Sequence, residues 1–418
     1  MCMFLLSSNV CCIPLLSSLL FNSLRGINSL RLCSPVRLHS GCRLACLTNA
    51  AETHGPVYRV NVLHWVLIYI TRNGLVTALN HEQWYKQRRI MDLAFSSVYL
   101  RGLMGTFNER AETLMEKLFY YFANNKKEAK MLHLVNCVTL DVIAKVAFGV
   151  DLDMLNKSSP FPKAIETCLK GLVYFIRDFF FAFNPKNWPF ISEVKEACRF
   201  LRETGAQWIQ DRKTAMRNGN IPQGHPYPDH HICWQRLRMT KEDEEFMLDN
   251  FVTFFIAGQE TTANLIALCI MQLAKHPDVL EKLKKELDEV IGMKQDLSYD
   301  DLGQLVYLSQ VLKETLRLYP PVPVTSRELK EDIVIDGIHI PGGVIGFFSS
   351  YVCGRMDKFF RDPLTFDPDR FHPDAPRPYY CYYPFALGPR SCLGQNFAQV
   401  GAMSRGHAAR SDGTLTGT

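Results

Sequence analysis

The longest run of mostly apolar positions in the chain covers residues 250–276 and ends at Pro277. A helix of this length spans about 40 Å, which is enough to cross a whole domain. Three polar residues, Gln259, Glu260 and Asn264, stand in its middle. Because a carboxylate at the centre of a bilayer is costly, the pattern predicts a long core helix rather than a membrane span.

Shorter periodic segments flank this run. Apolar positions recur with helical spacing through residues 80–149, and residues 277–292 and 307–321 predict two further helices, the first opened by a proline and the second ended by two. Residues 57–70 are rich in β-branched and aromatic side chains and predict a pair of strands. Residues 333–341 predict a hairpin whose Asp-Gly turn suits type I′ geometry. A proline-punctuated coil follows at residues 361–378.

The charge of the chain is concentrated at its N-terminus. The 418 residues carry a net charge of +5, but residues 1–51 contain four arginines and no Asp, Glu or Lys. Removing these four from 47 leaves 43 basic residues against 42 acidic ones. The remainder is near neutral, which argues against nucleic acid as a partner.

Residues 1–51 form a hydrophobic, arginine-rich leader. The first 21 residues are apolar but are interrupted by serines, Asn9 and Pro14. They predict a membrane anchor whose following arginines stay in the cytosol. A mitochondrial transit peptide, which is also rich in Ser and Arg and poor in acids, and a leader without function are the alternatives.

The fourteen cysteines show no C-x-x-C spacing, and six of them lie in the leader. The others are scattered, as expected of reduced thiols, so a disulfide framework is not indicated. A metal site at His225, His230, His231 and Cys233 is a weak alternative, because the spacing is irregular.

One cysteine, Cys392, stands in a loop of distinctive composition, FALGPRSCLG, that runs from Phe385 to Gly394. Gly388 and Gly394 would let backbone N–H groups approach the sulfur. Arg390 could pair with a carboxylate. A thiolate suffices as the one protein ligand of a metal when a macrocycle such as haem supplies four nitrogens. A structural cysteine in a glycine-rich turn is the alternative.

The long predicted helix contains AGQETT, residues 257–262. Gly258 would let a small ligand approach the backbone, while Glu260 and Thr261 would relay protons from solvent. A buried polar patch joined to a neighbouring helix is the other interpretation.

Two charged motifs have helical spacing. Glu314 and Arg317 lie one turn apart, which in isolation is typical of a weak surface ion pair. Trp84 and Arg88 stand at i, i+4, where both side chains could reach one anionic group, although an ordinary amphipathic helix would show the same spacing.

In this order and spacing, these segments and FDPDRF at residues 366–371 resemble the cytochrome P450 superfamily of haem-thiolate monooxygenases. The resemblance covers roughly residues 55 to 399. It implies a mainly α-helical fold with small β-sheets at one edge, and haem as the cofactor. The domains would be a leader at 1–51, an incomplete catalytic domain at 52–399 and a divergent tail at 400–418.

The resemblance also implies roles for single residues. Cys392 would be the axial metal ligand, Glu260 and Thr261 would be catalytic, and Glu314, Arg317 and Arg370 would form a structural triad. The cofactor would be bound by Trp84, Arg88, Gly258, Arg327, Phe385, Arg390, Cys392 and Gly394.

Longer stretches, among them EQWYKQRRIMDLAFS and DNFVTFFIAGQETTAN, resemble the cholesterol 24-hydroxylases of vertebrates. This narrower resemblance implies a sterol substrate and an enzyme at the cytosolic face of the endoplasmic reticulum membrane, with the mitochondrion as the alternative. No GxGxxG or flavin motif is present, so the electrons would come from NADPH-cytochrome P450 reductase.

The sequence departs from the family pattern at its end, 26 residues after Cys392. The helix after the cysteine is expected to begin near Gln395 and to lose its character beyond Gln399, where glycines disfavour it. The alternatives are therefore a non-catalytic truncated product that fails to retain haem, and an isomerase without external electrons. The Glu260–Thr261 pair argues against the isomerase.

Overall fold

A computed structural model describes residues 3–7, 57–59, 75–76, 78, 80–123, 130–177, 181–218, 241–292, 294, 296–376 and 380–408. The chain forms two compact units. The first comprises Met1–Leu63, Val322–Thr365 and Pro378–Pro384, and the second comprises His64–Pro321, Phe366–Arg377 and Phe385–Thr418.

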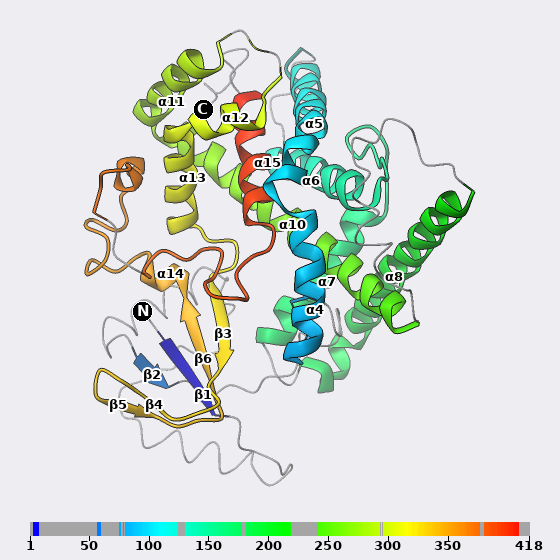
Figure 1. The fold of residues 1–418 in the computed structure, drawn as a ribbon, viewed down its shortest axis with the longest axis vertical. Coiled ribbons are helices and arrows are strands. Elements are labelled where there is room, and N and C mark those ends of the chain that lie inside the picture. The colour runs from blue at the N-terminus through cyan, green and yellow to red at the C-terminus, as the bar shows by residue number, and fades with distance from the viewer. Residues whose placement is uncertain are drawn as a thin grey trace. The chain divides into compact units, whose positions relative to one another are not determined.

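The second unit is helical (Figure 1). Its longest helix begins at Lys241, earlier than predicted, and ends before Pro277 as predicted. The predicted helices after this proline and before the double proline are confirmed. The α-helices are α4 (His81–Ala94), α5 (Ser97–Ala123), α6 (Met131–Phe148), α7 (Phe161–Arg177), α8 (Trp188–Arg217), α10 (Lys241–Lys275), α11 (Pro277–Val290), α12 (Tyr299–Gln304), α13 (Val306–Leu318) and α15 (Gln395–Ala408). The 3-10 helices are η2 (Phe181–Phe183), η3 (Pro185–Asn187) and η4 (Pro368–Phe371).

Helix α10 is central to the second unit and packs against α6, α8, α13 and α15. Aromatic rings fill the space between three of these helices. Phe148 of α6 lies 4.5 Å from Phe251 of α10, and Trp208 of α8 lies 5.5 Å from the same ring, measured between centroids. Phe251 and Phe255 have no exposed surface. Such pairs stabilise a fold beyond the area they bury, so the rings hold α6, α8 and α10 together.

The first unit contains two small sheets. The larger has the order β2-β1-β6-β3, in which β1 pairs parallel with β2 and antiparallel with β6, and β3 pairs antiparallel with β6. The register places Met3 opposite Phe348, and Val324 opposite Ser349. The elements are β1 (Met3–Ser7), β2 (Val57–Arg59), β3 (Val324–Glu328), β4 (Ile333–Ile335), β5 (Ile338–Ile340), β6 (Val344–Ser349) and the short helix α14 (Ser350–Cys353).

The hairpin formed by β4 and β5 is confirmed with the predicted turn. Asp336 and Gly337 have φ values of 50° and 78°, so both take the left-handed conformation of a type I′ turn. Of the strand pair predicted at residues 57–70, β2 is present and residues 60–70 lie outside the described residues. The mainly helical fold class with small sheets is therefore confirmed.

The leader differs from the expected anchor where the structure describes it. Met3–Ser7 is a strand within the larger sheet, because its backbone pairs with β6 on one side and β2 on the other. Residues 8–51 lie outside the described residues, as do His225, His230, His231 and Cys233. Of the described helices, α6 and Glu244–Lys275 within α10 are long and apolar enough to cross a membrane, which core helices of globular proteins also are.

The helix after the cysteine loop is longer than predicted. We expected helical character to fail beyond Gln399, but α15 continues through Gly401 and Gly406 to Ala408. Val400 and Ala402 are buried where α15 packs against α5 and α10. This burial outweighs the helix-breaking tendency of each glycine, which is about 1 kcal/mol.

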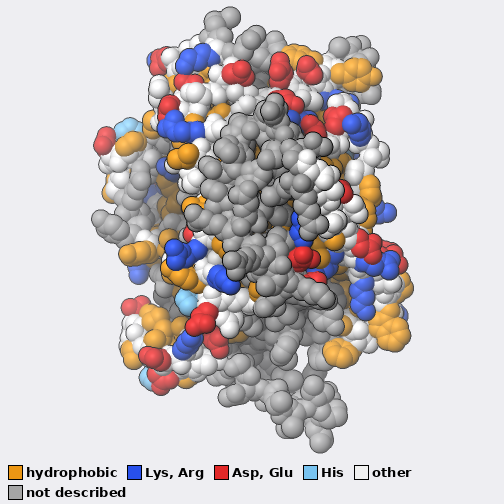
Figure 2. Space-filling model, turned by 45° about the vertical axis from the view of Figure 1, so that its right-hand side comes forward, with side chains coloured by type: hydrophobic (Ala, Val, Ile, Leu, Met, Phe, Trp, Pro, Cys, Tyr) orange, Lys and Arg blue, Asp and Glu red, His pale blue; other side chains and the backbone are white. Residues whose placement is uncertain are grey.

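On the face drawn in Figure 2, basic and acidic side chains of the described residues are interspersed.

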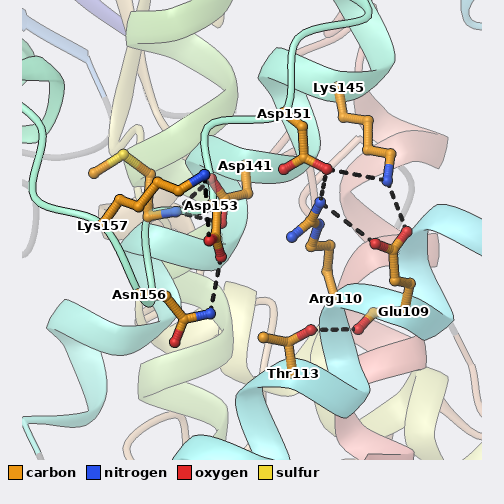
Figure 3. Close-up of polar contacts among 10 residues, drawn as sticks. Glu109, Arg110, Thr113, Asp141, Lys145, Asp151, Asp153, Asn156 and Lys157 are labelled. Atoms are coloured by element: carbon orange, nitrogen blue, oxygen red, sulfur yellow. Dashed lines mark hydrogen bonds and ion pairs between the residues drawn. The ribbon is translucent and has the colours of Figure 1, made fainter.

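A polar network joins α5, α6 and the loop after α6 (Figure 3). Arg110 of α5 donates to Asp151 of the loop, and Lys145 of α6 donates to Glu109 of α5 at 2.7 Å. The buried Asp141 of α6 accepts the backbone N–H of Met154 at 2.9 and 3.0 Å. These bonds fix the loop to both helices.

Asp141 gives this network a pH dependence. Burial raises the pKa of Asp141 to about 6, although the Met154 N–H and Arg110 act in the opposite direction. An unfolded aspartate titrates near pH 4, so between about pH 4 and pH 6 the folded state binds more protons. Stability therefore falls as the pH rises through this window.

We predict that Asp141→Asn, which still accepts the Met154 N–H but cannot ionise, gains stability relative to the unchanged protein between pH 4 and pH 7. The gain should be about 2–3 kcal/mol at most, which corresponds to two pKa units. Urea unfolding at both pH values measures it. A stability difference that does not change with pH would contradict the assignment.

Candidate active site

The loop around Cys392 is as tight as its sequence predicts. Gly388 has a φ of 79°, which glycine adopts without strain, and Ala386 has a φ of 59°. Ser391 N–H donates to the Gly388 carbonyl at 2.9 Å, and Cys392 N–H donates to the Phe385 carbonyl at 2.8 Å. Glycine is therefore needed at 388 for its conformation, and the loop is closed by backbone hydrogen bonds at both turns.

Cys392 is an exposed residue, and its sulfur lies among groups with opposing effects on its pKa. Desolvation raises the pKa of Cys392, while the backbone N–H of Gly394 and the charge of Arg88 act to lower it. The approach of the Gly394 N–H to the sulfur agrees with the prediction from sequence. Cys392 is thus an exposed residue whose thiol pKa is raised overall by desolvation, while a hydrogen-bond donor and a cation beside it favour the thiolate.

Two arginines, Arg88 and Arg390, lie against this loop. Their contacts differ from the pairing of Trp84 with Arg88 that the sequence spacing suggested. Arg88 of α4 donates to the Ser391 carbonyl at 2.7 Å and pairs with Asp92. The guanidinium of Arg390 lies 4.3 Å from the centroid of the Trp84 ring. The sequence spacing suggested that Trp84 acts together with Arg88, but the indole lies against the arginine of the cysteine loop.

The ring of Trp84 is buried with Leu75 and Ala78. The Ala78 carbonyl accepts a hydrogen bond of 2.8 Å from Arg390. A guanidinium stacked on an aromatic face and hydrogen-bonded at its edge is held in one orientation. Trp84 therefore positions Arg390 beside Cys392.

The AGQETT segment divides its residues between two faces of α10. A side-chain carbon at Gly258 would lie 3.1 Å from the Cδ1 atom of Ile143 in α6. Gln259 points the same way and donates to Asn136 of α6 at 3.1 Å. The side of Gly258 on which a side chain would stand is thus occupied by α6, so the glycine serves helix packing. The expectation that a small ligand approaches its backbone stays a prediction.

The other face of this segment is open. Ala257 is exposed, and Thr261 one turn later donates its hydroxyl to the Ala257 carbonyl at 2.6 Å. Glu260 is half-buried, and desolvation together with the charge of Glu166 raises its pKa. A carboxyl with a raised pKa beside an accessible hydroxyl is suited to passing protons.

Glu314 and Arg317 form a buried ion pair on α13. Two guanidinium nitrogens, Nε and Nη2, each lie 2.7 Å from a carboxylate oxygen, and neither side chain has exposed surface. Glu314 also accepts the backbone N–H of Asp367 at 2.8 Å, and Arg370 lies 3.4 Å from it. The structure brings all three predicted triad residues together and excludes the surface pair.

Some residues of the site were not found from sequence. Asn250 of α10 accepts the Leu75 N–H and donates to Gln87 of α4, at 2.9 and 3.1 Å. Its place in an otherwise apolar run is the signal that could have indicated a buried polar contact. Arg327 belongs to the first unit, on β3, where its Nη1 donates to the Ser326 carbonyl.

The donor set of the second unit fits a haem. Cys392 offers one accessible soft ligand, Gly394 supplies a hydrogen bond to the sulfur, and Arg88 and Arg390 supply two cations for acidic substituents. A family model described as Cytochrome P450 matches residues 47–403. The chain belongs to the cytochrome P450 family. Members of this family of monooxygenases bind haem through an axial cysteine thiolate.

Curated relatives agree with the family. Cytochrome P450 4d2 of Drosophila melanogaster is 28% identical over 398 residues, which are 83% of this chain and 78% of the relative. Cytochrome P450 3A7 of Homo sapiens is 30% identical over 343 residues, 78% of this chain and 66% of the relative. Cytochrome P450 4A14 of Rattus norvegicus is 30% identical over 336 residues, which are 77% of this chain and 65% of the relative. The match thus spans about two thirds of the length of the last two.

We predict that Glu314→Ala lowers the free energy of unfolding by about 3–5 kcal/mol, because it leaves the buried Arg317 without its counter-charge. The matched control is Glu289→Ala. It breaks the exposed helical pair with Lys285 and should cost less than about 1 kcal/mol. Urea unfolding of both variants measures the difference. Equal losses would show that the buried pair contributes no more than a surface pair.

Proposed function

We propose that this P450 is a haem-thiolate monooxygenase whose axial ligand is Cys392. The observation that carries the proposal is the exposed residue Cys392, whose sulfur is approached by the Gly394 N–H and by Arg88. When bound, haem supplies oxygen binding and activation. The protein supplies the ligand, its hydrogen bond and the surrounding charges.

The arginines of the site hold the acidic edge of the cofactor in this proposal. Arg390 is oriented by Trp84, and Arg88 is oriented by the Ser391 carbonyl and Asp92. Both guanidiniums therefore have fixed directions before a ligand arrives, which lowers the entropy lost on binding. Arg327 joins them by family resemblance, while Phe385 and Gly394 shape the loop.

Glu260 and Thr261 deliver protons. The raised pKa of Glu260 lets its carboxyl hold a proton closer to neutral pH than an ordinary glutamate, and Thr261 presents a hydroxyl on the open face of α10. The chain of transfer runs from solvent through the Glu260 carboxyl to the Thr261 hydroxyl.

The proposed substrate is a sterol, hydroxylated on its side chain. The support is the resemblance of five stretches of this sequence, including EQWYKQRRIMDLAFS, to cholesterol 24-hydroxylase. Electrons come from NADPH-cytochrome P450 reductase, and the proposed location is the endoplasmic reticulum membrane. The support for both is the family and the arginine-rich leader at residues 1–51.

We predict that Cys392→Ser abolishes the thiolate-type absorption spectrum of the reduced, carbon-monoxide-bound protein, because serine offers no soft ligand. Cys353→Ser and Cys381→Ser are the controls, since both cysteines are buried in a separate cluster of the first unit. Both controls should keep the spectrum. A full spectrum in Cys392→Ser would contradict the ligand assignment, and no spectrum in the unchanged protein would favour the non-catalytic alternative.

With cholesterol, reductase and NADPH, we expect a side-chain alcohol as product. Thr261→Ala should form it about ten- to a thousand-fold more slowly, because proton delivery fails, while oxygen consumption continues and is diverted to peroxide. Product and oxygen uptake measured together distinguish the outcomes. Equal loss of both would indicate a structural role, and turnover of other lipids without cholesterol would overturn the sterol proposal.

A further inference from the structure

Two cysteines of neighbouring helices touch one another away from the candidate active site. Cys168 of α7 and Cys198 of α8 have their sulfur atoms 3.5 Å apart, and both are free thiols. The two helices pack side by side within the second unit. The cysteines are 30 residues apart in the chain, so their contact comes from folding and not from sequence spacing.

The packing of α7 against α8 fixes this contact from both sides. Gly171, one turn beyond Cys168, lies so close to α8 that a side-chain carbon there would be 2.8 Å from the Cγ2 atom of Val194. Tyr174 and Phe190 form an edge contact at 5.4 Å in one direction along the helices. Phe161 and Phe200 form another at 5.4 Å in the other direction. The helices therefore run antiparallel with the thiols between two aromatic contacts.

The two thiols have different surroundings. Cys168 has no exposed surface, whereas Cys198 is partly exposed and can meet a small reagent from solvent. The hydrogen bond with Cys168 lowers the pKa of Cys198, burial raises it, and Arg202 one turn along α8 lowers it. Arg202 also forms ion pairs with Glu245 and Asp249, which limits how far it lowers the pKa of Cys198. Cys198 is thus the nucleophile of the pair and Cys168 the resolving thiol.

We propose that Cys168 and Cys198 form a reversible redox modification site that closes to a disulfide between α7 and α8. The oxidant is a two-electron oxidant of the peroxide class. The Cys198 thiolate attacks one peroxide oxygen, the O–O bond breaks, and a sulfenic acid and one water result. Cys168 then attacks this sulfur, and a second water leaves. The thiols give up two electrons and two protons, and hydrogen peroxide becomes two molecules of water.

The two sulfur atoms start close to one another before any oxidation. The sulfur atoms must move from 3.5 Å to the length of a disulfide bond, about 2 Å, which side-chain rotation supplies. The bond closes a loop of 30 residues and restricts the unfolded chain. The oxidised protein should therefore melt about 5 °C higher than the reduced one.

The test treats the full-length reduced protein with hydrogen peroxide and maps its peptides without reduction by mass spectrometry. We expect a cross-linked peptide pair containing Cys168 and Cys198, two hydrogen atoms lighter than the separate peptides and released by dithiothreitol. Phenylarsine oxide, which bridges adjacent thiols, should block its formation. Cys168→Ser should convert the response to single oxidation at Cys198, because the resolving thiol is gone.

The matched control is the pair Cys353 and Cys381, which also lie in contact but are both buried. It should cross-link at least tenfold more slowly, because neither thiol is accessible. Cross-linking of both pairs at the same rate would overturn the proposal. So would oxidation of Cys198 without a link to Cys168, or a cross-link that leaves the melting temperature unchanged.

Discussion

A carboxylate with no exposed surface has to be neutralised where it stands, and Glu314 is such a group. Arg317, one turn along the same helix, donates hydrogen bonds to both oxygens of this carboxylate. The backbone N–H of Asp367 donates a third. Asp367 begins the segment that contains η4, so this interaction fixes the end of a long coil to α13. Removing either charge would leave the other uncompensated in the core. Phe366 and Phe371 of this coil are buried as well, so the ion pair and apolar packing fix the coil together.

The second constraint is the close approach of helices at glycines. A side-chain carbon at Gly205 of α8 would lie 2.7 Å from the Phe251 ring, and one at Gly258 of α10 would lie 3.1 Å from Ile143. These glycines let α10 pack tightly on both neighbours. Gln259 and Thr261 are close in sequence but point in nearly opposite directions, since two residues turn the helix by about 200°. The same six-residue motif therefore contributes one face to the core and another to the chemistry, and Thr261 belongs to the open face.

Much of this could be predicted because local spacing determines local structure. Proline marked the end of α10 and the start of α11, and Asp336-Gly337 marked the hairpin turn. The tight loop at Cys392 followed from its glycines. Partners far apart in the chain could not be predicted in this way. Trp84 has Arg88 four residues away but stacks on Arg390, because the buried indole lies beside the cysteine loop in the folded chain. The persistence of α15 beyond Gln399 is of the same kind, since its stability comes from α5 and α10 and not from its own residues.

The cysteines of this chain differ in reactivity because their surroundings differ. Burial raises the pKa of Cys269 to about 12 and that of Cys137 to about 11, and no cation lowers either one. Such thiols pack as small apolar groups and are chemically inert. Desolvation also raises the pKa of Cys392, but the Gly394 N–H and Arg88 lie beside its sulfur, and the residue is exposed. Cys198 has a second thiol as its donor. Reactivity in this chain therefore depends on whether a donor or cation stands beside an accessible sulfur, and these two cysteines meet that condition at separate places in the fold.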